Sequence, residues 1–148
     1  MALLLTVNGE DRTSGHGAMT PLVDVLRDEF HLKGAKPVCR EGFCGACTVL
    51  LDDHPVMACL LPAGLAVGAR IRTVESLAPD GALSPLQQVM EEHDVVQCGM
   101  CFPGMLMSLS GFLAVTPRPT RDEVKAALSG NVCRCTGYER IIDAVLSL

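Results

Sequence analysis

The chain has 148 residues and a formal net charge of −5, and 49% of its residues are hydrophobic although only 3% are aromatic. Lys and Arg number only 12 and form no basic stripe, which argues against nucleic-acid binding. The apolar N-terminal segment lacks the features of a signal peptide, and no apolar run approaches the ~18 residues of a membrane span. We therefore expect a cytoplasmic protein with reduced thiols and no transmembrane segment.

The first half of the chain has the pattern of a small mixed β-sheet with one helix packed on it. Strands are expected at residues 2–7, 48–51, 56–59 and 70–74. Residues 10–19 are polar and contain glycine, so we expect a loop there or a poor edge strand. Thr20 followed by Pro21 predicts a helix start, with Thr20 as the N-cap and Pro21 at the first helical position.

In the second half of the chain the periodicity becomes helical, after a proline- and glycine-containing linker at residues 76–84. Capping boxes at Ser84 and Thr120 predict the starts of two helices. Apolar stripes predict two more helices, over residues 103–115 and 138–148. The sequence therefore predicts an α+β chain whose second part is a four-helix arrangement.

We expect two domains, residues 1–76 and residues 84–148, with no repeat relating them. A domain of ~70 residues with few aromatic side chains is marginally stable by burial alone, and such domains often depend on a metal. Metal sites are therefore expected to supply part of the folding free energy.

All eight cysteines fall into two quartets, and neither quartet leaves a cysteine spare. The first has the spacing Cys39-x4-Cys44-x2-Cys47-x11-Cys59. Its opening spacing is that of plant-type ferredoxins, in which four thiolates hold a [2Fe–2S] cluster. Gly42 and Gly45 allow the loop to turn tightly and to direct N–H groups at the sulfurs.

The second quartet has the spacing Cys98-x2-Cys101-x31-Cys133-x-Cys135. Its first pair precedes the helix expected near Pro103, and its second pair lies between two other helices. Helix N-termini carry partial positive charge, which favours thiolates and an anionic cluster. Gly99 permits close approach of the backbone to such a cluster.

Other uses of eight cysteines fit less well. A disulfide framework is typical of secreted chains, and no secretion signal supports it. Structural zinc sites usually pair two CxxC knuckles, and only one such knuckle occurs in each quartet. A Rieske site needs two histidines, and the four histidines form no such pattern. Two all-cysteine [2Fe–2S] clusters are favoured over a zinc- or iron-stabilised interaction module.

The two motifs together resemble molybdenum hydroxylases. Residues 36–51 (KPVCREGFCGACTVLL) and Cys59 are similar to the plant-type ferredoxin segment of that family. Residues 97–101 (QCGMC) and 130–138 (GNVCRCTGY) are similar to its helical cluster domain. The resemblance covers nearly the whole chain. It implies an N-terminal β-grasp, ferredoxin-like domain followed by a four-helix [2Fe–2S]-binding domain.

The family includes xanthine dehydrogenase, carbon monoxide dehydrogenase and aldehyde oxidoreductases, in which two clusters relay electrons from a molybdopterin centre to FAD. The resemblance implies that the second quartet holds the cluster nearer molybdenum and the first quartet the cluster nearer the flavin. It also implies that Gln97 contacts the pterin by a hydrogen bond. A structural hydrogen bond from Gln97 to the cluster loop is the alternative.

The chain is too short to hold molybdenum or FAD domains and has no GxGxxG fingerprint. It therefore resembles a separate small subunit that performs no substrate chemistry. Its implied partners are a large subunit with molybdopterin, as the cytosine dinucleotide, and a medium subunit with FAD. The assembly would be a heterotrimer or a dimer of heterotrimers. A free-standing two-cluster electron carrier is the alternative, although a diffusing carrier does not need a cluster buried among helices.

A few individual residues carry further expectations. Val38 stands where the family usually has glycine, and we expect it to restrict the loop backbone. Met100, Met105 and Met107 are expected to be core residues rather than a lid over the second cluster. Arg134 is expected to balance cluster charge or to make a local hydrogen bond.

Overall fold

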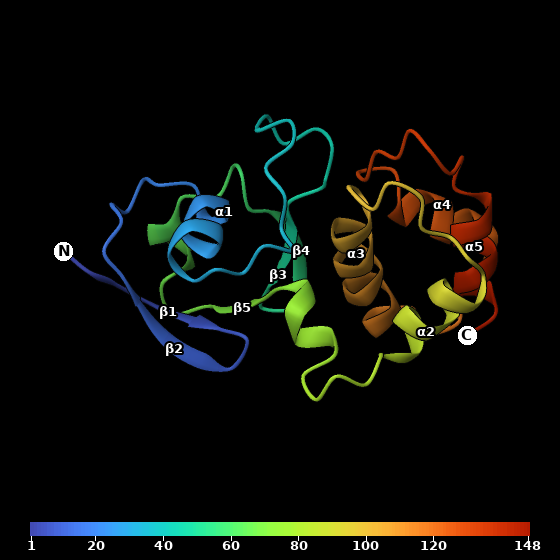
Figure 1. The fold of residues 1–148 in the computed structure, drawn as a ribbon, viewed down its shortest axis with the longest axis horizontal. Helices are drawn as coiled ribbons and strands as arrows, with labels where there is room; N and C mark the ends of the chain where they lie inside the picture. Colours follow the sequence, from blue (N-terminus) through green and yellow to red (C-terminus); the bar gives the residue numbers. More distant parts are fainter.

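The computed structural model covers residues 1–148 and contains a five-stranded sheet and five α-helices (Figure 1). The sheet and the first helix lie on the left of Figure 1, and the other four helices lie on the right. The α+β class predicted from the sequence is therefore confirmed. No helix combines the length and the apolar character needed to cross a membrane.

The sheet is mixed and has the strand order β2-β1-β5-β3-β4. Its strands are Leu3–Val7 (β1), Glu10–Ser14 (β2), Thr48–Leu51 (β3), His54–Met57 (β4) and Arg70–Arg72 (β5). The β1 strand pairs antiparallel with β2 and parallel with β5, and β3 pairs antiparallel with both β5 and β4. The β3–β4 hairpin places the first three cysteines just before β3 and Cys59 just after β4.

Residues 10–19 were expected to form a loop or a poor edge strand, and the structure shows an edge strand, β2, in their first half. Residues 10–14 form an edge strand, and the residues after them form no strand. The turn before β2 has Asn8 and Gly9 at φ of +53° and +81°, the left-handed geometry that matches the twist of a two-residue hairpin. An edge strand exposes most of its side chains to water, so its sequence lacks the alternation that marks buried strands.

The first helix differs from its predicted start. It runs over Leu22–Asp24 (α1) and continues as a π-helix over Val25–Glu29 (η1), and its N-cap is Pro21 with no side-chain cap. The prediction of Thr20 as N-cap is therefore wrong. Tertiary contacts replace the cap, because the N–H groups of Leu22 and Val23 donate to the carbonyl oxygens of Leu61 and Ala58 at 2.8 and 3.1 Å.

The other helices are Pro85–Glu92 (α2), Phe102–Val115 (α3), Arg121–Ala127 (α4) and Glu139–Leu146 (α5). Both predicted capping boxes are confirmed. The side chains of Ser84 and Thr120 accept from the N–H groups of Gln87 and Glu123, whose side chains accept in return. Two short 3₁₀ helices, Ala63–Ala66 (η2) and Val74–Leu77 (η3), flank β5.

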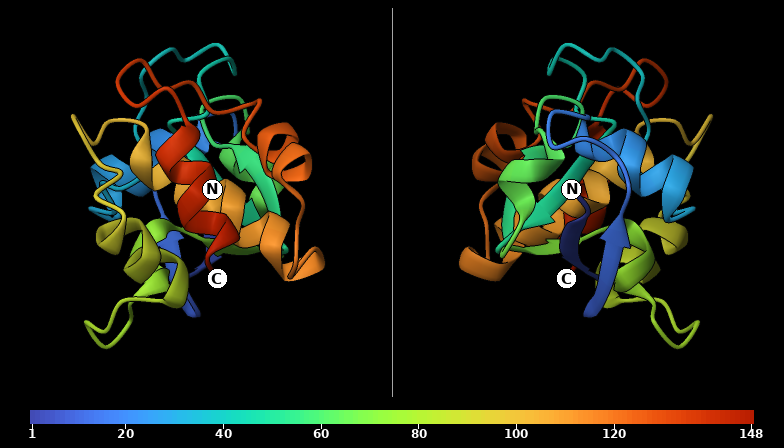
Figure 2. Two further views of the ribbon diagram at one scale, coloured as in Figure 1. Left: turned by 90° about the vertical axis from the view of Figure 1, so that its right-hand side faces the viewer. Right: turned by 90° about the vertical axis from the view of Figure 1, so that its left-hand side faces the viewer.

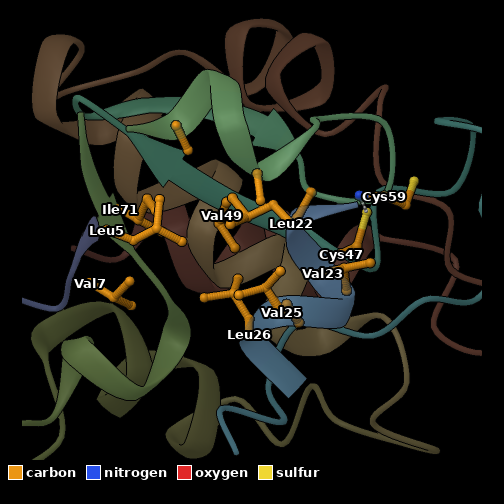
Figure 3. Close-up of a cluster of buried hydrophobic side chains, with 14 of the residues drawn as sticks. Leu5, Val7, Leu22, Val23, Val25, Leu26, Cys47, Val49, Cys59 and Ile71 are labelled. Carbon is orange, nitrogen blue, oxygen red and sulfur yellow. Dashed lines mark hydrogen bonds between the residues drawn. The ribbon is translucent and has the colours of Figure 1, made fainter. Parts of the chain in front are cut away.

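Two hydrophobic cores stabilise the chain. The first packs α1 and η1 onto the sheet, and Cys47 and Cys59 lie at one side of it (Figure 3). The second core lies among α2, α3, α4 and α5. Met105 and Met107 are buried as expected, but Met100 is 48% exposed, so the expectation that it is a core residue is wrong. Met100 precedes α3, in the segment between two cysteines, and no helix covers it.

The α3 helix packs against β3 and β4 and joins the two halves (Figure 1). Two glycines allow this close approach. A Cβ on Gly111 would lie 2.9 Å from Pro55, and a Cβ on Gly104 would lie 2.2 Å from the carbonyl oxygen of Gly45. In both end views of Figure 2 the cyan loop before β3 and the red-orange loop after α4 lie at the same end of the molecule. The first of these loops carries Cys39, Cys44 and Cys47, and the second carries Cys133 and Cys135.

We expect Gly104→Ala to destabilise the protein although alanine favours a helix by about 1 kcal/mol. The added methyl group would force α3 away from the loop at Gly45, and overpacking of this kind costs on the order of 1–3 kcal/mol. Denaturant unfolding would measure the change. The control is Gly130→Ala, whose Cβ meets only the Met57 side chain, at 3.9 Å. Equal stability of the two variants would contradict the tight packing of α3.

Candidate iron–sulfur sites

The first quartet gathers between the loop before β3 and the end of β4. Cys39 and Cys44 are half-buried, whereas Cys47 and Cys59 are buried in the first core (Figure 3). The thiol of Cys39 lies beside that of Cys44, and the thiol of Cys47 lies beside that of Cys59. Four thiols in two pairs suit a cluster of two irons in which each iron takes two thiolates.

Backbone N–H groups point at the sulfur of Cys39. The N–H groups of Glu41, Phe43 and Cys44 each donate to Cys39 Sγ at 3.4 Å. The loop needs left-handed backbone to achieve this, with φ of +58° at Arg40 and +69° at Gly42. These hydrogen bonds favour the thiolate and lower the pKa of Cys39 to about 6. Gly42 thus supplies one of the two left-handed residues of this turn.

The inner pair of the first quartet has the opposite environment. Burial raises the pKa of Cys47 to about 12, although the N–H of Cys59 donates to its sulfur at 3.4 Å. A thiolate in such apolar surroundings is unfavourable unless a cation compensates its charge. Bound iron would supply that charge, because a coordinating thiol is deprotonated outright. The donor set therefore fits a cluster whose inner thiolates are shielded from water.

An ion pair holds this loop to the first helix. Both terminal nitrogens of Arg40 donate to the carboxylate of Asp24, at 3.1 and 2.9 Å. Asp24 is the last residue of α1, where the helix changes to π-helical geometry. A bidentate pair fixes orientation as well as distance. Because Arg40 directly follows Cys39, the pair ties the N–H-donating turn to the body of the fold.

The second quartet lines one small cavity together with Gln97 and Gly99. Its members come from the segment before α3 and from the segment between α4 and α5, as the sequence predicts. Cys98 lies beside Cys135 and Cys101 lies beside Cys133, again as two pairs. The first of these pairs is exposed and the second is half-buried. Nowhere in the chain do three His, Cys, Asp or Glu side chains converge as they would around a single metal ion.

The second quartet also combines thiolate-favouring and apolar surroundings. The N–H of Met100 lowers the pKa of Cys98, whereas burial raises the pKa of Cys101 to about 12. Burial is the largest influence on the pKa of Cys133 and acts to raise it, but hydrogen bonds from Thr136, from the Cys135 backbone and with Cys101 together outweigh it, and the net pKa falls. The hydroxyl and N–H of Thr136 lie 3.1 and 3.4 Å from Cys133 Sγ. Each quartet thus pairs at least one hydrogen-bonded thiol with one in an apolar site.

Tyr138 shapes the segment that carries the second pair. Its hydroxyl accepts the N–H of Cys133 at 2.8 Å and donates to the carbonyl oxygen of Asn131 at 3.0 Å. Its backbone is left-handed, with φ of +70°, which is unusual for a bulky residue and marks a constrained turn. Sequence reasoning assigned no hydrogen bond to Tyr138 and no role to Asp24 or Thr136, because only tertiary structure brings their partners together.

Gln97 makes a structural hydrogen bond to the cysteine-bearing loop, the alternative to a contact with the pterin. Its Nε2 donates to the carbonyl oxygen of Cys135 at 3.1 Å, which links the two segments of the second quartet. The side chain is nevertheless exposed beside two exposed cysteines. Arg134, between two cysteines, is exposed as well.

Val38 does not strain the first loop. Its backbone is not in the left-handed region that favours glycine, so valine fits this position without strain. Its side chain lines a cavity of about 190 Å³ with Cys44, Met100 and all four cysteines of the second quartet. One cysteine of the first quartet, Cys44, therefore borders the same space as the whole second quartet.

Comparison with known proteins agrees with this geometry. Residues 73–146 match the family model described as "[2Fe-2S] binding domain". The nicotine 6-hydroxylase small subunit of Paenarthrobacter nicotinovorans is 51% identical over 140 residues, which covers 95% of this chain and 84% of that protein. The xanthine dehydrogenase iron-sulfur-binding subunit of Escherichia coli O157:H7 is 45% identical over 130 residues, or 86% and 80% of the two chains.

This chain belongs to the small iron–sulfur subunits of the molybdenum hydroxylases. The crystal structure of quinoline 2-oxidoreductase from Pseudomonas putida 86 aligns with 99% of this chain and 90% of its own, at a TM-score of 0.95 and 44% identity. The resemblance inferred from the cysteine motifs is thus confirmed. Both relatives are named as subunits of oxidoreductases.

We expect Arg40→Lys to shorten the lifetime of the first cluster, because lysine keeps the charge but cannot form the bidentate pair with Asp24. Loss of visible absorbance in the presence of an iron chelator would measure the lifetime. Arg134→Lys is the control, because Arg134 also adjoins a cysteine but lies between Cys133 and Cys135 of the second quartet. If the two variants lose iron at the same rate, the ion pair does not hold the loop.

Proposed function

We propose that this chain is the electron-transfer subunit of a three-subunit molybdenum hydroxylase. It would pass electrons from the molybdopterin centre of a large subunit to the FAD of a medium subunit. The observation that supports this most strongly is the gathering of eight cysteines into two quartets, each arranged as two pairs of adjacent thiols. No substrate chemistry is assigned to the chain itself.

In this proposal each quartet holds one [2Fe–2S] cluster, which when bound supplies a one-electron carrier. Residues 1–76 form the β-grasp, plant-type ferredoxin-like domain and residues 84–148 the four-helix domain. The first cluster is held by Cys39, Cys44, Cys47 and Cys59. The second is held by Cys98, Cys101, Cys133 and Cys135. The chain fixes the ligands, directs N–H groups at sulfur and keeps the inner thiols away from water.

The exposure of the second quartet supports its assignment to the molybdenum side. Cys98 and Cys135 are exposed, and exposed Gln97 adjoins them. We propose that Gln97 keeps its hydrogen bond to Cys135 while its amide also meets the pterin, as the cytosine dinucleotide form, on the large subunit. The first quartet then faces the flavin subunit. The complex would be a heterotrimer or a dimer of heterotrimers in the cytoplasm.

Exposed apolar side chains near the quartets favour a subunit over a free carrier. Val38, Phe43, Val96 and Met100 are 53%, 72%, 43% and 48% exposed. Apolar groups gathered on a surface mark interaction sites, and a freely diffusing carrier would leave these in water.

The substrates named for relatives include nicotine, xanthine and quinoline. Because this chain would not touch substrate, those names do not select one for its complex.

We expect iron and acid-labile sulfide at about four each per chain and two distinct EPR signals on reduction. We also expect this chain to co-purify with molybdopterin- and FAD-containing chains at fixed stoichiometry. Zinc in place of iron, with no visible absorbance, would refute the proposed function. A stable redox-active monomer in cell extract would favour the free carrier instead.

We expect Cys135→Ser to abolish the EPR signal of the second cluster and to leave that of the first. The two quartets share no cysteine. Cys47 and Cys59 belong to the first core, whereas Cys101 and Cys133 pack against the second core. EPR of the reduced complex would measure both signals. Cys59→Ser is the reciprocal variant and should remove only the first signal. Loss of both signals from either substitution would contradict two independent sites.

A further inference from the structure

The loop that carries Cys39, Cys44 and Cys47 is hydrogen-bonded to the loop that carries Cys133 and Cys135. The N–H of Val132 donates to the carbonyl oxygen of Cys44 at 2.8 Å. Val132 directly precedes Cys133, so this bond joins the backbone at a cysteine of the first quartet to the backbone beside a cysteine of the second. The views in Figure 2 place both loops at one end of the molecule.

Asn131 adds a side-chain link at the same junction. Its Nδ2 donates to the carbonyl oxygen of Gly45 at 3.2 Å, and the residue is 3% exposed. On its other side, the carbonyl oxygen of Asn131 accepts from the Tyr138 hydroxyl, which accepts the N–H of Cys133. A continuous chain of hydrogen bonds therefore runs from the first loop, through Asn131 and Tyr138, to a cysteine of the second quartet.

The packing around this link leaves no room for adjustment. A Cβ on Gly45 would lie 2.3 Å from the carbonyl oxygen of Gly130 and 2.7 Å from Asn131 Nδ2. The carbonyl oxygen of Gly45 also accepts the Thr48 hydroxyl at 2.7 Å and lies against Gly104 of α3. Close-packed interiors of this kind transmit displacement instead of absorbing it. The position of Asn131 thus fixes how the two loops meet.

We propose that Asn131 is a positioning residue that sets the distance and relative orientation of the two [2Fe–2S] clusters. This inference rests on the proposed function, because it requires both clusters. Asn131 binds neither cluster itself, and it acts by holding the Gly45 turn against the Cys133 segment. Electron transfer between two centres slows steeply with their separation, so the buried amide controls the transfer rate within the subunit.

The magnetic coupling between the two reduced clusters tests this proposal, because dipolar splitting depends on the distance and orientation of the two spins. The measurement uses the fully reduced holoenzyme complex and its EPR spectrum. In Asn131→Asp, a carboxylate oxygen replaces the amide donor and faces the Gly45 carbonyl oxygen. We expect both cluster signals to persist at full iron content, with a smaller and more heterogeneous splitting and slower intramolecular reduction of the flavin.

The matched control is Asn8→Asp. Asn8 also joins distant segments through its amide, donating to the Thr73 hydroxyl at 2.9 Å and accepting the Thr73 N–H at 2.8 Å, but it lies in the β1–β2 turn. This variant removes a comparable hydrogen bond and should leave the splitting unchanged. An equal change in both variants would assign the effect to lost stability and overturn the proposal.

A second, uncharged variant, Asn131→Ser, tests the proposal if Asn131→Asp does not fold. Asn131→Ser removes the amide but leaves Thr48 as a donor to the Gly45 carbonyl oxygen. If either variant keeps both clusters and the wild-type splitting, the positioning role is refuted while the proposed function stands. Loss of a cluster in both variants would make Asn131 a requirement for cluster binding and would also refute it. An unsubstituted protein without two cluster signals would overturn the proposed function, and this inference with it.

Discussion

The burial of cysteine thiols is the constraint on which the rest of this structure depends. A buried thiolate loses the hydration of its charge, and only a cation or N–H donors can replace that hydration. The first loop turns through left-handed residues to place N–H groups around Cys39, while Cys47 and Cys59 remain in the apolar core. Because Cys47 belongs to the same core as the sheet and first helix, a cluster bound by the first quartet would couple metal binding to the folding of this half.

Features with a local cause could be predicted from the sequence. The capping boxes at Ser84 and Thr120 form within four residues, so the helices that they start follow from the sequence alone. The cysteine spacings likewise indicate which residues can share a loop, and the structure places Cys39 beside Cys44, Cys47 near Cys44 and Cys59, and the second quartet around one cavity. Strand β3 has its predicted bounds because its residues are apolar and bracketed by turns.

Features that depend on distant partners could not be predicted in this way. The start of α1 differs from the prediction because carbonyl groups some forty residues later cap it in place of Thr20. Asp24 meets Arg40, and Asn131 meets Gly45, only after the sheet and the helices have packed. The hydrogen bond from Gln97 to Cys135 could be stated only as one of two alternatives, because an exposed amide has no period or spacing to indicate its partner.

The strand order of the sheet also bears on how the chain avoids self-association. Unpaired edge strands can template pairing with other chains and so promote aggregation. One edge, β2, carries charged Glu10, Asp11 and Arg12. At the other edge, β4 contains Pro55, which has no N–H to donate and packs where Gly111 lets α3 approach. Charge at one edge, and proline with a helix at the other, discourage extension of the sheet by a second chain.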